Sequence, residues 1–155
     1  PSREDVEIMK KHHGVAVHCP DATNNIIAGI MGVAELEKQG VSLSVGTDVG
    51  GGHSMGAYSQ VSRAVQLSKL KWFYEGEPHA PISFAHAFYM ATREGGSIFG
   101  KVGALEKGYT LNALVIENLS DKNMSLTPAQ VVERFCYIGN PSNIKARYLN
   151  GTLIG

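Results

Sequence analysis

Short apolar runs alternate with amphipathic stretches over the first 100 residues. Apolar residues at every second position predict a strand over residues 41–47, and the run VAVHC, ended by Pro20, predicts another over residues 15–19. Apolar positions at helical spacing predict helices over residues 2–13, 25–39, 54–74 and 82–99. Helices and strands that alternate in short units are typical of parallel β/α architecture.

The predicted helix over residues 25–39 has a defined start, end and apolar side. Asn24 or Asn25 would cap its beginning, and Gly40 would close it. Its apolar face would consist of Ile26, Ile27, Ile30, Met31, Val33 and Ala34.

Two parallel strands are too few to make a stable sheet that is covered on both faces. The sequence also lacks an initial Met and begins directly in a helix, because Ser2 and Asp5 have the spacing of a capping box. We therefore expect a missing N-terminal portion, with this chain as a piece of a larger barrel.

The pattern changes after about residue 101. A turn-rich stretch leads to a predicted strand over residues 112–117, and Thr127 followed by Pro128 predicts the start of a short helix. Asn150 and Gly151 lie between two apolar stretches, which is a strong hairpin signal. The tail is therefore predicted to form a small β layer, separate in character from residues 1–100.

The candidate chemistry lies in the segment VGTDVGGGHS, residues 45–54. Asp48 stands where the strand over residues 41–47 ends, and glycines follow it. A carboxylate at the end of a buried strand, before a flexible turn and a helix, is where α/β enzymes place chemistry. The local sequence is equally compatible with a turn or helix-capping role for Asp48. The glycines do not form a phosphate loop, because GxxxxGK[ST] is absent, and they instead favour close approach of the backbone.

Other polar residues near these strands have both structural and functional interpretations. His53 could line a pocket mouth, but a surface or capping role is favoured, and for His18 a hydrogen-bonded structural role is favoured. Asn24 is expected to cap a helix, Cys19 to be a small buried residue, and His86 to be packed or solvated.

Composition narrows the classes of partner. Fourteen basic and fourteen acidic residues balance, so charge favours neither nucleic acid nor an anionic membrane as a partner. No apolar run approaches the roughly 18 residues of a membrane span. Cys19 and Cys136 lie far apart without CxxC spacing, which favours reduced thiols in a cytoplasmic protein.

Several motifs together resemble the amidohydrolase superfamily. They are HCPDATN at residues 18–24, GTDVGG at residues 46–51, and the stretches over residues 91–100 and 102–108. Within the superfamily the similarity is greatest to the guanine deaminases. It covers essentially the whole sequence but corresponds only to the C-terminal portion of a family member. The HCPxSN motif of the family is one residue longer here, so a rim loop is expected to differ.

The resemblance implies a fold and a division into domains. The family fold is a metal-dependent (β/α)8 TIM barrel with a small composite β-sandwich. Residues 1–100 would be the C-terminal part of the barrel, with strands seven and eight and their helices. Residues 101–155 would be part of the β-sandwich.

The resemblance also implies a metal site. The family holds zinc with a His-x-His pair, a further His and an Asp at the end of strand eight, and only the last has a counterpart here, Asp48. The other ligands of the one zinc ion would lie outside this segment. Asp48 would then be both a metal ligand and a catalytic proton relay.

The implied reaction is zinc-dependent hydrolysis of guanine to xanthine and ammonia in purine metabolism, by a homodimeric enzyme. This segment alone is expected to be inactive. The aromatic run at residues 72–74, which includes Trp72, is a candidate subunit contact. Two alternatives stay open: a related amidohydrolase acting on another amino- or chloro-substituted heterocycle, and, if the chain is complete, a non-catalytic α/β module.

Overall fold

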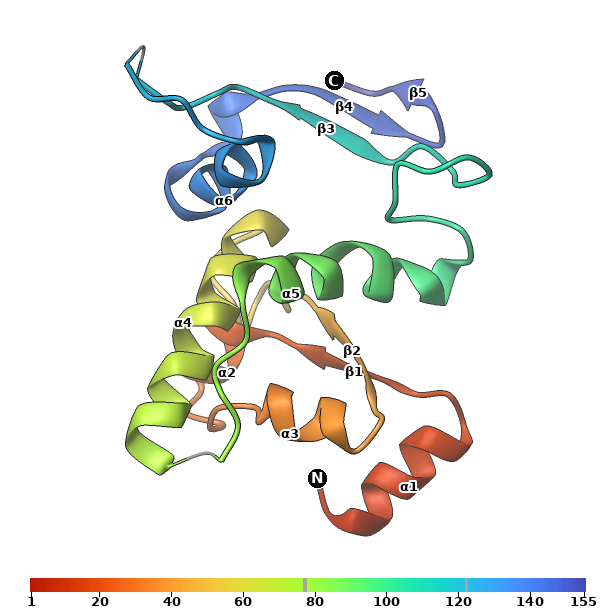
Figure 1. Cartoon of the computed structure of the whole chain (residues 1–155). Coiled ribbons are helices and arrows are strands. Elements are labelled where there is room, and N and C mark those ends of the chain that lie inside the picture. The colour runs from red at the N-terminus through yellow and green to blue at the C-terminus, as the bar shows by residue number, and fades with distance from the viewer. Residues whose placement is uncertain (77, 122) are drawn as a thin grey trace.

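The computed structural model of the chain describes residues 1–76, 78–121 and 123–155. A β/α unit formed by the first part of the chain lies beside a small antiparallel layer formed by the last part (Figure 1). In chain order the elements are α1 (Arg3–Lys11), β1 (Val15–His18), α2 (Pro20–Asn25), α3 (Val33–Lys38), β2 (Ser42–Val45), α4 (Ala57–Glu75), α5 (Phe84–Tyr89), the π-helix η1 (Met90–Glu94), the 3-10 helix η2 (Ser97–Phe99), β3 (Ala113–Ile116), α6 (Pro128–Ile138), the 3-10 helix η3 (Pro141–Asn143), β4 (Ile144–Leu149) and β5 (Thr152–Leu153).

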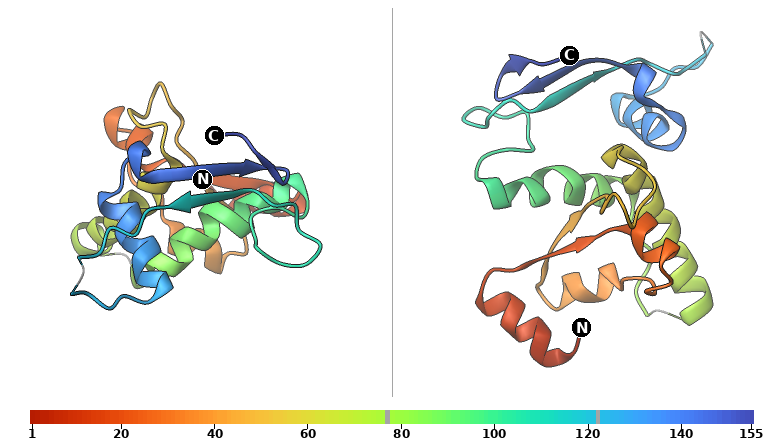
Figure 2. Two further views of the ribbon diagram at one scale, coloured as in Figure 1. Left: turned by 90° about the horizontal axis from the view of Figure 1, so that it is seen from above. Right: turned by 180° about the vertical axis from the view of Figure 1, so that it is seen from behind.

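The two strands predicted in the first part pair in parallel, as expected. Their register runs from Val15 opposite Ser42 to His18 opposite Val45. Helix α3 lies on one side of the pair, and α5 with η1 lies on the other, in both the front and the rear views (Figures 1 and 2). Because both strands run in the same direction, their carboxyl ends meet at one edge. Segments that follow β1 and β2 are therefore brought together there.

Among the described helices, α4 contains the most buried residues. Val61, Ala64 and Val65 belong to the same apolar core as Leu43 and Val45 of β2. Val61 and Val65 lie at helical spacing on the buried face of the helix that was predicted over residues 54–74. Trp72, near the end of the same helix, is 47% exposed.

The last part of the chain forms an antiparallel sheet in the order β3-β4-β5. The predicted hairpin is confirmed: Asn150 and Gly151 have φ angles of 51° and 77°, the left-handed values that a tight turn between β4 and β5 requires. Helix α6 begins with a capping box between Thr127 and Gln130. The hydroxyl of Ser62 in α4 donates to the carbonyl of Cys136 in α6 at 3.0 Å, which joins the layer to the β/α unit.

The predicted helix over residues 25–39 is only partly correct, because its second half forms α3, which ends next to Gly40, whereas its first half is not helical. Pro20 begins a helix earlier than predicted, and that helix ends at Asn25, while α3 starts only at Val33. Ile27 and Gly29 between them have φ angles of 56° and 91°, which no continuous right-handed helix allows. Ile26 and Ile27 are exposed rather than part of an apolar face.

The helix predicted over residues 82–99 is partly wrong. It begins at Phe84 with Ser83 as its cap, but it widens into the π-helical turn η1 and closes with the 3-10 turn η2. Over the described ranges 1–76, 78–121 and 123–155, no helix is both long and apolar enough to cross a membrane.

Candidate active site at the carboxyl ends of the strands

Asp48 lies just beyond the end of β2, at the edge where the carboxyl ends of both strands meet. Its backbone is left-handed, with φ at 43°, a conformation that Asp tolerates better than most residues. In the part of the chain that the structure describes, no hydrogen-bond donor is directed at its carboxylate. Both oxygens are therefore available to a ligand, and this geometry fits a metal-binding carboxylate.

The loop after Asp48 closes on itself and packs against helix α2. The N–H of Gly52 donates to the carbonyl of Asp48 at 2.7 Å, and the N–H of Gly50 donates to the carbonyl of Gly52 at 3.0 Å. A Cβ atom on Gly51 would lie 3.1 Å from Asp48 Oδ2 and 3.3 Å from the Cβ of Ala22. The close backbone approach predicted for these glycines is thus observed.

A buried polar cluster, which the sequence analysis missed, stands behind this loop. Asp21 is 5% exposed, and Gln60 of α4 is completely buried. Gln60 Nε2 donates to Asp21 Oδ2 at 2.7 Å, while Gln60 Oε1 accepts the Asp21 N–H at 3.2 Å. Arg63 Nε lies 3.1 Å from Asp21 Oδ1, so the buried carboxylate is paired as well as hydrogen-bonded. A Gln among the core-facing positions of α4 was the one sequence signal for this cluster.

His53 and Asn25 connect the loop to that cluster. His53 Nε2 lies 3.6 Å from Asp21 Oδ2, and its Nδ1 lies 3.4 Å from Asn25 Nδ2. Asn25 Nδ2 also donates to the carbonyl of Gly51 at 2.9 Å. His53 is at the surface, as predicted, but it also pairs with a buried carboxylate. Asn24 lies inside α2, so its predicted role as the cap of the following helix is wrong.

His18 is buried at the end of β1. Burial lowers its pKa to about 4, so the ring is neutral at physiological pH. The predicted structural placement holds, but the hydrogen bond expected of it is missing at Nδ1, which has no partner among the described residues. His86 is packed and pairs with Glu37 at 3.1 Å, away from Asp48.

Cys19 follows His18 directly and is only partly buried. Burial raises the pKa of its thiol, and the nearby carboxylate of Asp48 raises it further, whereas the N–H of Gly46 acts in the opposite direction. The thiol is thus kept protonated, which argues against its use as a nucleophile or a metal-binding thiolate.

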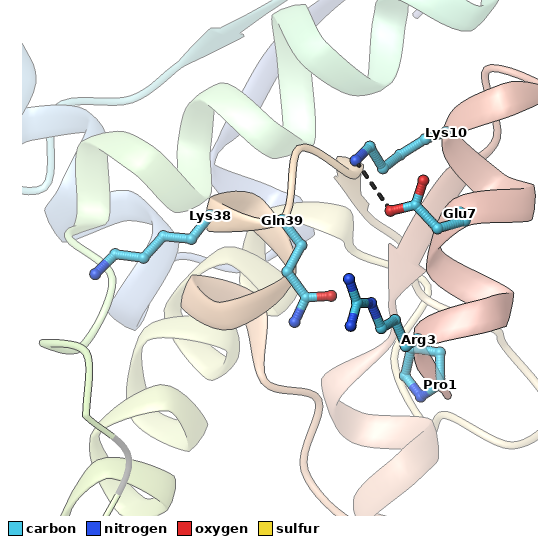
Figure 3. Close-up of a pocket in the computed structure, with 6 residues that line it drawn as sticks. All are labelled: Pro1, Arg3, Glu7, Lys10, Lys38 and Gln39. Carbon is cyan, nitrogen blue, oxygen red and sulfur yellow. Dashed lines mark hydrogen bonds and ion pairs between the residues drawn. The ribbon is translucent and has the colours of Figure 1, made fainter.

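Asp48 is the one predicted metal ligand in this sequence, and its side chain does not belong to a complete metal site within the described residues. Among the described residues, no three His, Cys, Asp or Glu side chains come together in a group that could hold a metal ion. A pocket between α1 and α3, lined by Arg3, Lys10 and Lys38 among others, does not include Asp48 (Figure 3). Each of the two helices ends just before a strand begins, so this pocket lies towards the amino ends of β1 and β2, opposite to Asp48.

Comparison with known proteins gives consistent matches over the whole chain. A family model described as "Amidohydrolase family" matches residues 1–154. Guanine deaminase from Mus musculus is 27% identical over 162 residues, and that from Homo sapiens is 26% identical; each match covers 97% of this chain. The chain spans 36% of the length of these curated relatives.

Solved structures match equally completely. A crystal structure of guanine deaminase from C. acetobutylicum with guanine bound in the active site has a TM-score of 0.92 and 38% identity, covering 100% of this chain and 37% of that one. An adenosine deaminase from Xanthomonas campestris with bound zinc has a TM-score of 0.77 over 99% of this chain and 33% of that one. At 17% identity, this second likeness shows the fold alone.

Proposed function

The chain belongs to the amidohydrolase family, and from this premise we propose that the protein is a zinc-dependent guanine deaminase to which these residues contribute one metal ligand. One observation supports this proposal more strongly than the others. The whole chain superimposes on part of a guanine deaminase that holds guanine in its active site, with 38% identity and a TM-score of 0.92.

Asp48 is the residue to which we assign the chemistry. Zinc, when bound, supplies a water molecule whose pKa is lowered to about 7. Asp48 would hold the metal through one carboxylate oxygen. It would also take the proton of the attacking water and return it to the departing amine. Water adds to the carbon that bears the amino group, the C–N bond breaks, and guanine plus water yields xanthine plus ammonia.

The site geometry supports Asp48 as one ligand of the metal site. Asp48 stands at the carboxyl end of a parallel strand, and its oxygens are uncommitted within the described part of the chain. Zinc is bound in the matched adenosine deaminase and in a mutant atrazine chlorohydrolase from Arthrobacter aurescens. We therefore propose one zinc ion, with its remaining ligands supplied by residues outside this sequence.

The proposal extends to the organisation of the protein. We assign residues 1–100 to the last part of a (β/α)8 barrel and residues 101–155 to part of a β-sandwich. The change from a parallel strand pair to an antiparallel sheet supports this division. A homodimer located in the cytoplasm is proposed as well, from the family resemblance and the spacing of the cysteines.

A second candidate is an amidohydrolase that acts on another heterocycle. A 5'-deoxyadenosine deaminase from Methanopyrus kandleri is 25% identical over 97% of this chain, and triazine hydrolase variants share the fold with a TM-score of 0.77. Because these residues include only one assigned site residue, they do not by themselves select guanine over adenosine derivatives or triazines.

The decisive experiment uses the protein produced from its complete gene. Guanine, adenosine, 5'-deoxyadenosine and atrazine are offered separately, and ammonia, chloride and xanthine are measured before and after removal of zinc by a chelator. Equal amounts of xanthine and ammonia from guanine, lost with the zinc and restored with it, are expected. Turnover of another substrate alone would favour the second candidate, and no turnover of any would favour the non-catalytic module. Residues 1–155 alone are expected to be inactive.

A further inference from the structure

We propose that Asn25 is a positioning residue: it ties the loop that carries Asp48 to helix α2, and the buried Asp21–Gln60 pair locks that helix to α4. The inference deepens the proposed function and rests on it, because it assigns a task to Asn25 only if Asp48 binds the metal.

The first step is the direct bond between α2 and the loop. Asn25 is the last residue of α2, and its Nδ2 donates to the carbonyl of Gly51 at 2.9 Å. The same amide lies 3.4 Å from His53 Nδ1, so one side chain contacts the loop at two points. The loop is closed behind these points by the bond from the Gly52 N–H to the Asp48 carbonyl at 2.7 Å.

The second step is the narrow space between Gly51 and the carboxylate of Asp48. The position of a Cβ atom on Gly51 is only 3.1 Å from Asp48 Oδ2 and 3.3 Å from the Cβ of Ala22. Gly51 is therefore packed between the carboxylate and the first turn of α2. A shift of Gly51 towards Asp48 would therefore bring the loop backbone against the carboxylate.

The third step is the anchor at the other end of α2. Asp21, near its first residue, is held by two reciprocal hydrogen bonds to Gln60 and by the guanidinium of Arg63. The two hydrogen bonds to Gln60 are buried, where an unmade hydrogen bond is most costly, so α2 is held firmly against α4. Helix α2 is thus fixed to the core at its start and to the Asp48 loop at its end.

Residues that orient a metal ligand affect metal affinity without touching the metal. Loss of such a partner typically lowers metal affinity or activity by about 10–100-fold. Asn25 is exposed, so its substitution leaves the core intact. Its neighbour Asn24 is also exposed and makes no side-chain hydrogen bond within the described residues, which gives a matched control of the same type one position away.

The test compares Asn25→Ala with Asn24→Ala in the protein produced from its complete gene. Zinc affinity is measured by competition with a chromophoric chelator, and kcat and KM for guanine are measured on the zinc-loaded proteins. Asn25→Ala is expected to weaken zinc binding about 10–100-fold and to lower kcat more than it raises KM, while Asn24→Ala stays within about twofold of the wild type. Asn25→Gln, which keeps an amide donor, is expected to lose less than Asn25→Ala.

Unchanged zinc affinity in Asn25→Ala, or an equal loss in Asn24→Ala, overturns the inference. Equal thermal unfolding midpoints of the two variants exclude a general loss of structure. If Asn25→Ala does not fold, Asn25→Asp, which keeps the shape but removes the amide donor to Gly51, is compared with Asn24→Asp, and equal zinc affinities then overturn the inference. A wild-type protein that binds zinc but leaves guanine intact overturns the proposed substrate, whereas the comparison of affinities still stands. A wild-type protein without zinc affinity overturns both.

Discussion

The backbone N–H of Leu43 in β2 donates to Oε1 of Glu94 in the π-helical turn η1, at 2.8 Å. Leu43 is only 1% exposed, and the N–H of Gly46 in the same chain segment is directed instead at the carbonyl of His18 in β1. The Leu43 N–H, which makes no hydrogen bond to β1, thus finds its acceptor in a side chain 51 residues further along the sequence.

Substitution of Glu94 by Ala should therefore destabilise the fold. The Leu43 N–H would be left buried without an acceptor, which typically costs about 1–3 kcal/mol of unfolding free energy. Glu94→Gln keeps an acceptor oxygen and is the matched control, with a smaller expected loss. Urea unfolding of both variants measures the difference, and equal midpoints would contradict the assigned role of this bond.

The role proposed for Asp48 predicts that the conservative substitution Asp48→Asn strongly lowers activity and zinc affinity. Asp48→Asn keeps the shape of the side chain but removes its charge and its ability to relay a proton. Ammonia release from guanine is expected to fall by at least about 100-fold, together with zinc affinity. Asp5→Asn, in the capping box of α1, is the matched control and should retain activity. Near-normal ammonia release by Asp48→Asn would refute the assignment.

The tight packing of the glycine loop predicts a steric effect at Gly52. A Cβ atom there would collide with the carbonyl oxygen of Thr47, next to Asp48, so the loop would have to shift. Gly52→Ala is expected to lower both activity and stability, the latter by about 1–3 kcal/mol. Gly14→Ala is the control, because its nearest neighbour, Met9, is 3.4 Å away. Thermal unfolding and guanine turnover of the two variants check this, and a fully active Gly52→Ala protein would show that the loop adapts.

Burial of His18 predicts a loss of stability in acid. Its pKa is about 4 in the folded chain against 6.5 for the unperturbed group, so the unfolded state binds the extra proton first. The stability present above pH 6.5 should decline as the pH falls towards 4, by at most about 3 kcal/mol from this group. Urea unfolding at several pH values measures the slope. His18→Gln should flatten it, and an unchanged slope in that variant would assign the effect to other groups.

The homodimer stays a prediction, and the aromatic run near the end of α4 is its proposed contact. Trp72, Phe73 and Tyr74 are 47%, 71% and 76% exposed, which leaves a large apolar area available to a second subunit. Trp72→Ala is expected to shift the sedimentation equilibrium mass towards that of a monomer. Phe99→Ala removes an even more exposed aromatic side chain from η2 as a control. A Trp72→Ala protein with unchanged native mass would count against this contact.

Local sequence patterns predicted most elements of the fold. The two strands of the first part, their parallel pairing, helix α4 and the hairpin at Asn150 are confirmed, because each depends on periodicity or on turn residues close in sequence. The α/β fold class and the amidohydrolase resemblance are confirmed by the matched family and structures. The first half of the helix predicted over residues 25–39 is not helical. Ile26 and Ile27 have helical spacing, but Pro20 starts a separate helix before them and Gly29 allows a left-handed turn after them.

The position of Asp48 at the end of a strand and the close turn of the glycines after it can be predicted from the residues alone. Both are local properties, since they follow from alternation and from residues without a side chain. The groups that hold this turn in place are known only from the way the helices pack. Asn25, Asp21 and Gln60 are up to 39 residues apart, and their hydrogen bonds depend on how α2 packs against α4 and the loop. Such contacts are selected by packing and by the cost of burying unpaired polar groups, which no local pattern encodes.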